Sequence, residues 1–169
     1  MKIFLVGFMG SGKTNIGRLL AEPIGYNFVD TDSYIEMKYG MTVSEIFAQH
    51  GEAAFRNMER DVLLEMQKHD FVVVATGGGL PCFKDNMDMM LADGRVVYLK
   101  TFPQSLVSRL MRSPTERPLI KGKTERELTQ YVSEKLAIRE KYYHRAHFIV
   151  QTETLSLDKL LQLLNLKKF

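Results

Sequence analysis

The stretch at residues 7–14, Gly-Phe-Met-Gly-Ser-Gly-Lys-Thr, has the residue types and the spacing that hold a phosphate group. Its glycines let backbone N–H groups close around phosphate oxygens, because no Cβ stands in the way. Lys13 can reach the outer phosphates of a nucleotide, and Thr14 offers a hydroxyl to Mg²⁺. An apolar run at residues 3–6 precedes the stretch and a helical pattern follows it, and this context makes the match specific. The pattern predicts a nucleotide site rather than a turn that only packs a helix on a sheet.

A nucleotide site of this kind is compatible with three classes of protein: a kinase of small molecules, a switch GTPase and a nucleotide-gated binding module. A GTPase should also carry an [NT]-K-x-D motif that reads guanine, and the sequence has none. A kinase differs from a binding module in having an acceptor site, where a second substrate receives the phosphoryl group.

Two groups of residues are candidates for the acceptor site. Asp30 and Asp32 follow a short predicted strand at residues 27–29, and three glycines, 77–79, follow the apolar run at residues 71–75. In an extended chain the two aspartates point the same way, so one could hold a magnesium-bound water and the other a substrate hydroxyl. A solvated turn with an aspartate that caps the next helix explains the same spacing equally well.

Two arginines could bind an anionic substrate. Arg56 lies three residues before Glu59, whose carboxylate could hold the guanidinium in place while it binds the anion. Arg139 lies much further along the chain, and taken singly each arginine is more often an exposed surface residue. The strand before the three glycines does not end in an aspartate, so Mg²⁺ would depend on Thr14, the phosphates and water relayed by Asp30.

The elements that must position these residues alternate along the chain. Strands are expected at residues 3–6, 27–29, 71–75, 96–99 and 148–150. Helices are expected at 13–21, from Thr42 to Gly51, and at 52–67, 85–91, 104–110, 124–144 and about 157–164. Strands that alternate with helices predict a parallel sheet covered on both faces. Ligands bind outside the carboxyl ends of such strands, so the aspartates and the glycines should lie at one edge of the sheet.

The composition is that of one globular domain of 169 residues, with 45% apolar and 25% charged residues. A net charge of +3 is too small to argue for nucleic acid binding and fits small anionic ligands equally well. The apolar run at residues 3–6 is too short for a signal peptide or a membrane span, and a single cysteine allows no internal disulfide. We expect a cytoplasmic protein that binds neither a membrane nor nucleic acid.

The chain resembles the shikimate kinases over essentially its whole length. The matching motifs are the glycine-rich stretch followed by Gly17, then Asp30-Thr31-Asp32, Phe55-Arg56-Asn57-Met58-Glu59, Gly77-Gly78-Gly79, Arg117-Pro118-Leu119 and Arg139-Glu140-Lys141-Tyr142-Tyr143. A phosphate loop alone is widely shared, whereas this ordered set of motifs is highly specific.

The resemblance implies a three-layer α/β fold of the P-loop NTPase class, similar to nucleoside-monophosphate kinases. Such a fold has a parallel sheet of about five strands, helices on both faces and a mobile lid, here at about residues 112–123. The implied reaction is transfer of the γ-phosphoryl group of ATP to the 3-hydroxyl of shikimate, on the route to aromatic amino acids. We expect one domain, residues 1–169, that works as a monomer with Mg²⁺.

The resemblance also implies a role for each matching residue. The nucleotide would be bound by Gly10, Ser11, Gly12, Lys13, Thr14, Asn15, Arg109 and Arg117. Shikimate would be bound by Asp32, Arg56, Gly77, Gly78, Gly79 and Arg139. Mg²⁺ would be held by Thr14 directly and by Asp30 through water. The catalytic residues would be Lys13, Asp32 and Arg117.

Some points stay open in the sequence. Arg109 and Arg112 both compete to stack on adenine, and we favour Arg109. The adenine contact after the last strand is also open, because that segment reads Gln-Thr-Glu-Thr-Leu-Ser. At an ordinary pKa of about 3.9, Asp32 would be a poor base and would chiefly orient the acceptor hydroxyl. A gluconate or nucleoside-monophosphate kinase, or a nucleotide-sensing module without catalysis, would also explain the phosphate loop.

Overall fold

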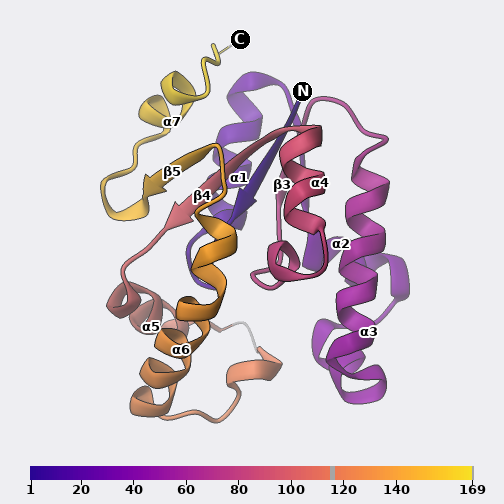
Figure 1. The fold of residues 1–169 in the computed structure, drawn as a ribbon, viewed down its shortest axis with the longest axis vertical. Coiled ribbons are helices and arrows are strands. Elements are labelled where there is room, and N and C mark those ends of the chain that lie inside the picture. The colour runs from indigo at the N-terminus through magenta and orange to yellow at the C-terminus, as the bar shows by residue number, and fades with distance from the viewer. Residues whose placement is uncertain (115–116, 169) are drawn as a thin grey trace.

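The fold, seen in a computed structural model that describes residues 1–114 and 117–168, is built on one five-stranded parallel sheet in the order β2-β3-β1-β4-β5 (Figure 1). The strands are β1 Lys2–Val6, β2 Asn27–Asp30, β3 Val72–Ala75, β4 Arg95–Lys100 and β5 Phe148–Gln151. The helices are α1 Lys13–Ala21, α2 Thr31–Tyr39, α3 Val43–Met66, α4 Asn86–Asp93, α5 Pro103–Arg112, α6 Glu125–Tyr143 and α7 Leu157–Leu163. Within the described residues, no helix is both long enough and apolar enough to cross a membrane.

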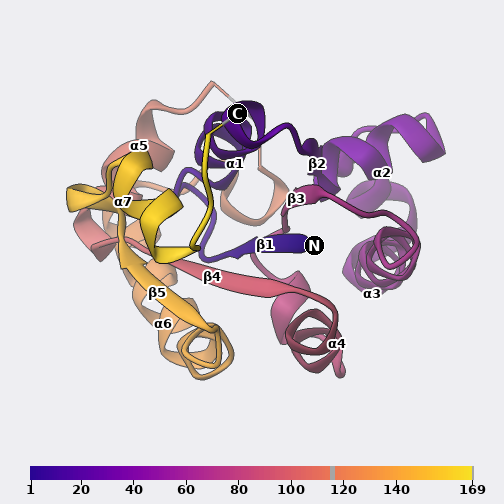
Figure 2. The same ribbon diagram turned by 90° about the horizontal axis from the view of Figure 1, so that it is seen from above.

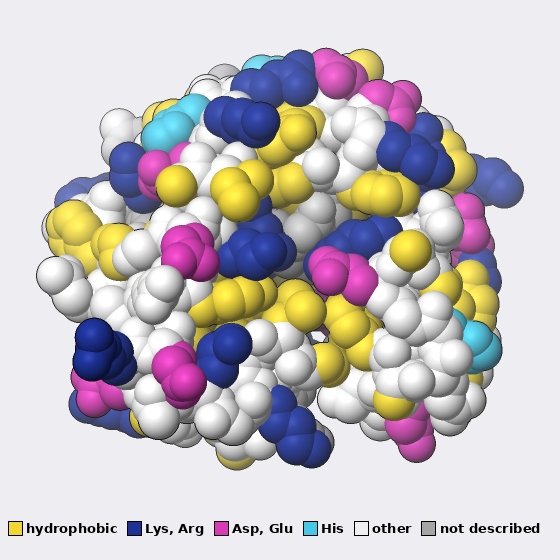
Figure 3. All heavy atoms as spheres, turned by 60° about the horizontal axis from the view of Figure 1, so that its bottom comes forward, with side chains coloured by type: hydrophobic (Ala, Val, Ile, Leu, Met, Phe, Trp, Pro, Cys, Tyr) yellow, Lys and Arg dark blue, Asp and Glu magenta, His cyan; other side chains and the backbone are white. Residues whose placement is uncertain are grey.

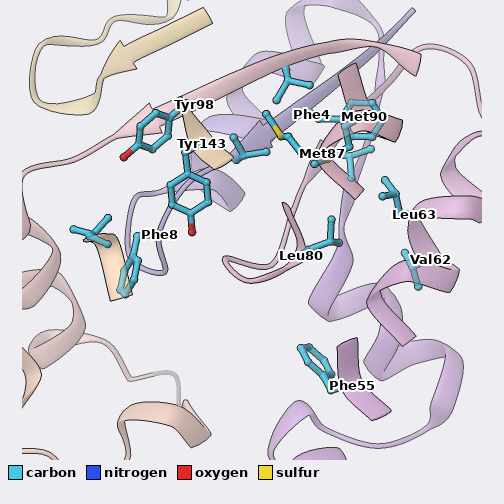
Figure 4. Close-up of a cluster of buried hydrophobic side chains, with 14 of the residues drawn as sticks. Phe4, Phe8, Phe55, Val62, Leu63, Leu80, Met87, Met90, Tyr98 and Tyr143 are labelled. Atoms are coloured by element: carbon cyan, nitrogen blue, oxygen red, sulfur yellow. The ribbon is translucent and has the colours of Figure 1, made fainter. Parts of the chain in front are cut away.

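The central strand β1 divides its side chains between two cores. Ile3 and Leu5 pack with residues of α1 and α7 on one face of the sheet. Phe4 and Val6 pack with residues of α3, α4 and α6 on the other face, and Figure 4 shows part of this second core. Figure 2 shows the two helical layers on opposite sides of the sheet. Residues 3–6 of β1 are all apolar because both faces of the strand are covered, and this confirms the predicted three-layer α/β fold.

The predicted helix boundaries follow from local chemistry. The Thr42 hydroxyl accepts a hydrogen bond from the backbone N–H of Glu45, whose carboxylate accepts one from Thr42 N–H, and this capping box opens α3. Thr124 makes the same reciprocal pair at the start of α6. At Gly51 the backbone has a φ of 80°, which no helix allows, so α3 consists of two helical segments on either side of this residue.

Two predicted details of the fold are corrected. Helix α2 is not predicted from the sequence. Only Thr31 and Ile35 of this helix are buried, so its sequence shows no apolar stripe. Phe71 lies outside β3, with a φ of 53° and 57% of its surface exposed. Within the expected lid, Arg112 is the last residue of α5 and Pro118–Ile120 form a 3₁₀ turn, whereas residues 115–116 lie outside the described residues. The mobility of the lid stays a prediction.

Candidate active site

The glycine-rich stretch forms a cradle between β1 and the first turn of α1. Gly10 and Gly12 have φ values of 83° and 89°, a backbone conformation that side chains with a Cβ rarely adopt. The Lys13 ammonium folds over the cradle and donates to the carbonyl oxygens of Gly7 and Phe8, each at 2.8 Å. Burial and the nearby charge of Arg117 lower the pKa of Lys13 to about 8, which leaves it mainly protonated at neutral pH. The cradle therefore presents positive charge and a helix N-terminus to an anion.

Thr14 and Asp30 meet beside the cradle. The Thr14 hydroxyl donates to Asp30 Oδ2 at 2.6 Å. The other oxygen, Asp30 Oδ1, accepts hydrogen bonds from the backbone N–H groups of Asp32 at 3.1 Å and Ser33 at 3.4 Å, so Asp30 is the N-cap of α2. The two aspartates therefore do not share one extended segment. The predicted helix cap is confirmed, whereas the role of Asp30 toward Mg²⁺ stays a prediction.

Asp32 lies in the first turn of α2 and points into the site. Its Oδ1 is buried and has no hydrogen-bond partner among the described residues. Burial, and then the neighbouring charge of Asp30, raise the pKa of Asp32 to about 6. The expectation of an ordinary aspartate pKa is wrong, because it took no account of how deeply the fold places this carboxyl group.

The three glycines after β3 are needed because charged side chains approach them closely. A Cβ on Gly77 would lie 2.1 Å from Glu59 Oε1 and 2.9 Å from Asp32 Oδ1, so these two carboxylates flank the same point. A Cβ on Gly79 would lie 2.5 Å from the central carbon of the Arg56 guanidinium. The glycine turn, defined as residues 77–79, thus forms a wall against which the charged groups pack.

Arg56 is held between two carboxylates of α3. Its guanidinium bonds to Glu59 Oε2 at 2.5 Å and to Glu52 Oε1 at 2.9 Å. The prediction that Glu59 holds this guanidinium is confirmed. Glu59 is completely buried, and burial together with the charge of Asp32 raises the pKa of Glu59 to about 7, although Arg56 acts against this shift.

Arg139, on α6, approaches the same turn from the opposite side. It is only 7% exposed, and its guanidinium lies over the Phe8 ring, 5.4 Å from the centroid. Its Nη1 is buried and makes no hydrogen bond to any described residue. The general expectation of an exposed surface arginine does not hold here. A buried guanidinium nitrogen without a hydrogen-bond acceptor indicates a place for an anionic ligand.

Two adjoining cavities open on the face formed by the carboxyl ends of the strands (Figure 3). The first, of about 440 Å³, lies over the cradle and is lined among others by Gly10, Gly12, Lys13, Arg109 and Arg112. The second, of about 210 Å³, is lined among others by Arg56, Glu59, Gly79, Leu119 and Arg139. The residues that line both are Met9, Asp32, Gly77, Gly78 and Arg117. The sequence-predicted residues for the two substrates thus gather in two neighbouring chambers.

Three of the residues predicted to bind the nucleotide, Ser11, Thr14 and Asn15, line neither cavity. Ser11 is completely buried beneath the cradle, whereas Thr14 and Asn15 are exposed at the start of α1. Arg109 donates to the carbonyl oxygen of Gly10 at 3.3 Å. Arg112 lines the first cavity as well, so both arginines stay candidates for the adenine contact.

Sequence analysis missed an apolar wall of the second cavity. It consists of Val43, Phe47 and Phe55, with the two phenylalanine rings 5.0 Å apart. Met9, within the glycine-rich stretch, was also not singled out, although its side chain borders both cavities. Apolar residues on a helix indicate burial in general, and only the fold shows that these line a ligand site.

Comparison with known proteins points to one family. The family model for shikimate kinase matches residues 9–165. A shikimate kinase from Parabacteroides distasonis is 44% identical over 152 residues, which cover 90% of this chain and 88% of the relative. The crystal structure of shikimate kinase from Bacteroides thetaiotaomicron superimposes with a TM-score of 0.93 at 38% identity, covering 98% of this chain and 99% of that chain.

A second solved structure, shikimate kinase from Acinetobacter baumannii in complex with shikimate, has a TM-score of 0.88 at 37% identity. The match covers 97% of this chain and 90% of that chain. These matches span nearly all the elements that build the two cavities, so the chain belongs to the shikimate kinase family.

Proposed function

We propose that the protein transfers the γ-phosphoryl group of ATP to the 3-hydroxyl of shikimate, and that Asp32 brings the two substrates together. ATP-dependent phosphorylation of shikimate, a step toward aromatic amino acids, is the activity of the family. The observation that carries the proposed site is that Asp32 lines both cavities. The nucleotide would occupy the first cavity and shikimate the second, so the reacting groups would meet beside this carboxylate.

The nucleotide phosphates would be held by backbone N–H groups of Gly10, Ser11, Gly12 and Asn15 at the start of α1. Lys13, whose ammonium now bonds to the carbonyls of its own loop, would turn toward the outer phosphates. Arg117 has a buried Nε without a partner among the described residues and borders both cavities. It would contact the phosphoryl group as it moves from one substrate to the other.

Mg²⁺ fits the pair formed by Thr14 and Asp30. Their oxygens are 2.6 Å apart, and Mg²⁺ takes oxygen ligands while keeping several waters. Thr14 would bind the ion directly and Asp30 through water. β3 ends at Ala75 and so offers no aspartate to Mg²⁺. Asp30, at the end of the neighbouring strand β2, would take that role instead. When bound, the ion would neutralise charge on the β and γ phosphates.

Shikimate carries a carboxylate and ring hydroxyls, and the second cavity offers a partner for each. Arg56 and Arg139 would bind the carboxylate by charge-assisted hydrogen bonds. Asp32 would accept a hydrogen bond from the ring hydroxyl that is phosphorylated. The glycine turn would donate backbone N–H groups, and the wall formed by Phe47 and Phe55 would pack against the apolar face of the ring.

The chemistry needs mainly positioning and charge neutralisation, because phosphoryl transfer passes through a loose transition state. Asp32 would orient the acceptor oxygen toward the phosphorus and take its proton late in the transfer. With a pKa of about 6, it is a better base than an ordinary aspartate and is still mostly ionised at neutral pH. Lys13 and Arg117 would stabilise the negative charge on the oxygens of the transferred group.

We also propose that the protein acts as a monomer in the cytoplasm. Asp32, Arg56 and Arg139, which come from α2, α3 and α6 of one chain, already surround the second cavity, and this supports an acceptor site that is built within one copy. Size-exclusion chromatography with light scattering tests the monomer, and a mass near 19.4 kDa is the expected result.

A coupled assay of ADP release tests the proposed function. The purified protein is given ATP and Mg²⁺ with shikimate, gluconate or a nucleoside monophosphate in turn. Release is expected with shikimate alone, and NMR of the product should place the phosphate on the 3-hydroxyl. Release with one of the other acceptors and not with shikimate would identify a different kinase. Binding of ATP without release for any acceptor would identify a nucleotide-sensing module.

A further inference from the structure

Tyr143, the last residue of α6, is completely buried, yet its phenol reaches the glycine turn. The hydroxyl donates to the carbonyl oxygen of Gly78 at 2.6 Å. Its ring packs against Tyr98, with centroids 5.0 Å apart, and Figure 4 shows the Tyr143 hydroxyl at the end of the ring that points away from Tyr98. Burial raises the pKa of Tyr143 above its ordinary value, so the phenol stays protonated and remains a donor.

This hydrogen bond sets the direction of the peptide between Gly78 and Gly79. In a trans peptide the C=O and the N–H point in opposite directions, and the described chain has no cis peptide. A Gly78 carbonyl held by Tyr143 therefore directs the Gly79 N–H the other way. Within residues 1–114 and 117–168, the N–H groups of Gly78 and Gly79 have no protein acceptor, and both glycines line the second cavity. Two donors are thus available to a ligand.

Gly78 has little room to move without disturbing its neighbours. A Cβ on this residue would lie 3.3 Å from the backbone nitrogen of Met9 and 3.4 Å from Arg139 Nη1. Arg139 lies one helical turn before Tyr143 on the same face of α6, and its side chain also interacts with the phenol. The Tyr143 hydroxyl therefore contacts both Gly78 of the glycine turn and Arg139.

We propose that Tyr143 is a positioning residue for the acceptor. Its hydroxyl holds the Gly78 carbonyl so that the Gly79 N–H faces shikimate, and it keeps the Arg139 guanidinium in place for the carboxylate. Tyr143 does not line the second cavity and so acts through these two residues. This inference rests on the proposed function, in which shikimate is the ligand of that cavity.

Steady-state kinetics of Tyr143→Phe test the proposal, because this change keeps the ring and removes only the hydroxyl. The KM for shikimate should rise about fivefold or more, the scale of one neutral hydrogen bond, whereas the KM for ATP should stay within about twofold. The matched control is Tyr98→Phe, which changes the other ring of the packed pair. It removes a hydroxyl that donates to Glu140 Oε1 at 3.3 Å. The control should keep the wild-type KM for shikimate.

Three results would overturn the proposal: an unchanged KM for shikimate in Tyr143→Phe, an equal rise in both KM values, or an equal rise in the Tyr98→Phe control. Failure of the proposed function would look different, since the wild-type protein itself would release no ADP with shikimate.

A measurement on the wild-type protein keeps the test decisive if Tyr143→Phe does not fold. A buried, hydrogen-bonded phenol proton exchanges slowly and should give an NMR signal close to the Gly79 amide proton. Saturating shikimate should shift both signals. A phenol proton that is unaffected while shikimate binds would contradict the proposal.

Discussion

The nucleotide end and the acceptor end of the active site are built in opposite ways. The proposed nucleotide end is built mainly from one short stretch, residues 7–14, whose backbone N–H groups would bind the phosphates, with Arg109, Arg112 and Arg117 beside it. The acceptor end collects charged side chains from α2, α3 and α6 around the glycine turn. There Glu59 is fully buried and Arg139 is 7% exposed.

This difference determines which end depends more on its ligand. Lys13 satisfies itself with carbonyl oxygens of its own loop, so the nucleotide end is internally bonded without a nucleotide. In the acceptor end, Asp32 Oδ1, Glu59 Oε1 and Arg139 Nη1 are buried without a partner in the described part of the chain. Leaving such groups unpaired costs free energy, and a ligand with hydroxyls and a carboxylate would supply the missing partners.

The largest effect is expected at the junction of the two ends. Asp32→Asn keeps the shape of the side chain but removes its charge and its ability to take a proton. The kcat with shikimate should fall by about 10²- to 10⁴-fold, with little change in the KM for ATP. The matched control is Asp61→Asn, an exposed aspartate of α3 that should keep wild-type turnover. A kcat within threefold of wild type would show that transfer does not need the Asp32 carboxylate.

The next effect should be confined to the acceptor end. Arg139→Ala removes a charge-assisted contact to the shikimate carboxylate, worth about 1.5–3 kcal/mol, so the KM for shikimate should rise about 10- to 150-fold. The KM for ATP should change little. Arg126→Ala, an exposed arginine near the start of the same helix, is the control. If the KM for ATP rose as much as that for shikimate, the division between the two ends would be wrong.

The buried acid at the acceptor end should make the ligand-free protein less stable as pH rises. The pKa of Glu59 is about 7 in the folded state and about 4.5 when unfolded, so the native state binds more protons between these values. The free energy of unfolding should therefore fall by about 1–3 kcal/mol from pH 5 to pH 8. Asp32, with its own pKa raised to about 6, contributes to the same slope.

Urea unfolding at several pH values measures this slope. Glu59→Gln should reduce it, because the amide does not titrate. Glu52→Gln is the matched control, since Glu52 bonds to the same guanidinium from an exposed position. An equal slope in wild type and Glu59→Gln would mean that Glu59 keeps its charge in the ligand-free site.

The smallest effect concerns the nucleotide end. Arg109→Ala should raise the KM for ATP about two- to fivefold, the scale of a partly exposed cation–π contact, and should leave the KM for shikimate unchanged. The same measurement on Arg112→Ala decides between the two arginines that line the first cavity. A larger rise for Arg112→Ala would reverse our assignment of the adenine contact.

The same contrast explains how much the sequence could predict. The nucleotide cradle is formed by residues that are neighbours in the sequence, and so are the capping boxes at Thr42 and Thr124. Both kinds of feature could therefore be predicted from the sequence alone. Helix α2 was missed because it buries too few residues to show a helical period. The spacing of Asp30 and Asp32 therefore fitted an extended pair and a helix cap equally well, and only the structure shows that Asp30 caps α2.

The acceptor end could not be derived from spacing. Arg56 and Arg139 are 83 residues apart in the sequence, and the one local signal was Glu59, three residues after Arg56. Their common place around the glycine turn depends on how α3 and α6 pack against the sheet. The raised pKa of Asp32 likewise results from burial by the fold. Only the resemblance to a family indicated these roles before the fold was known.

A crystal structure with shikimate, Mg²⁺ and a non-hydrolysable ATP analogue tests the central claim most directly. The shikimate ring should occupy the second cavity with its carboxylate between Arg56 and Arg139. Its 3-hydroxyl should lie about 2.6–3.2 Å from an Asp32 oxygen and face the terminal phosphorus of the nucleotide. A ring bound in another place, or turned so that a different hydroxyl faces the nucleotide, would contradict the account.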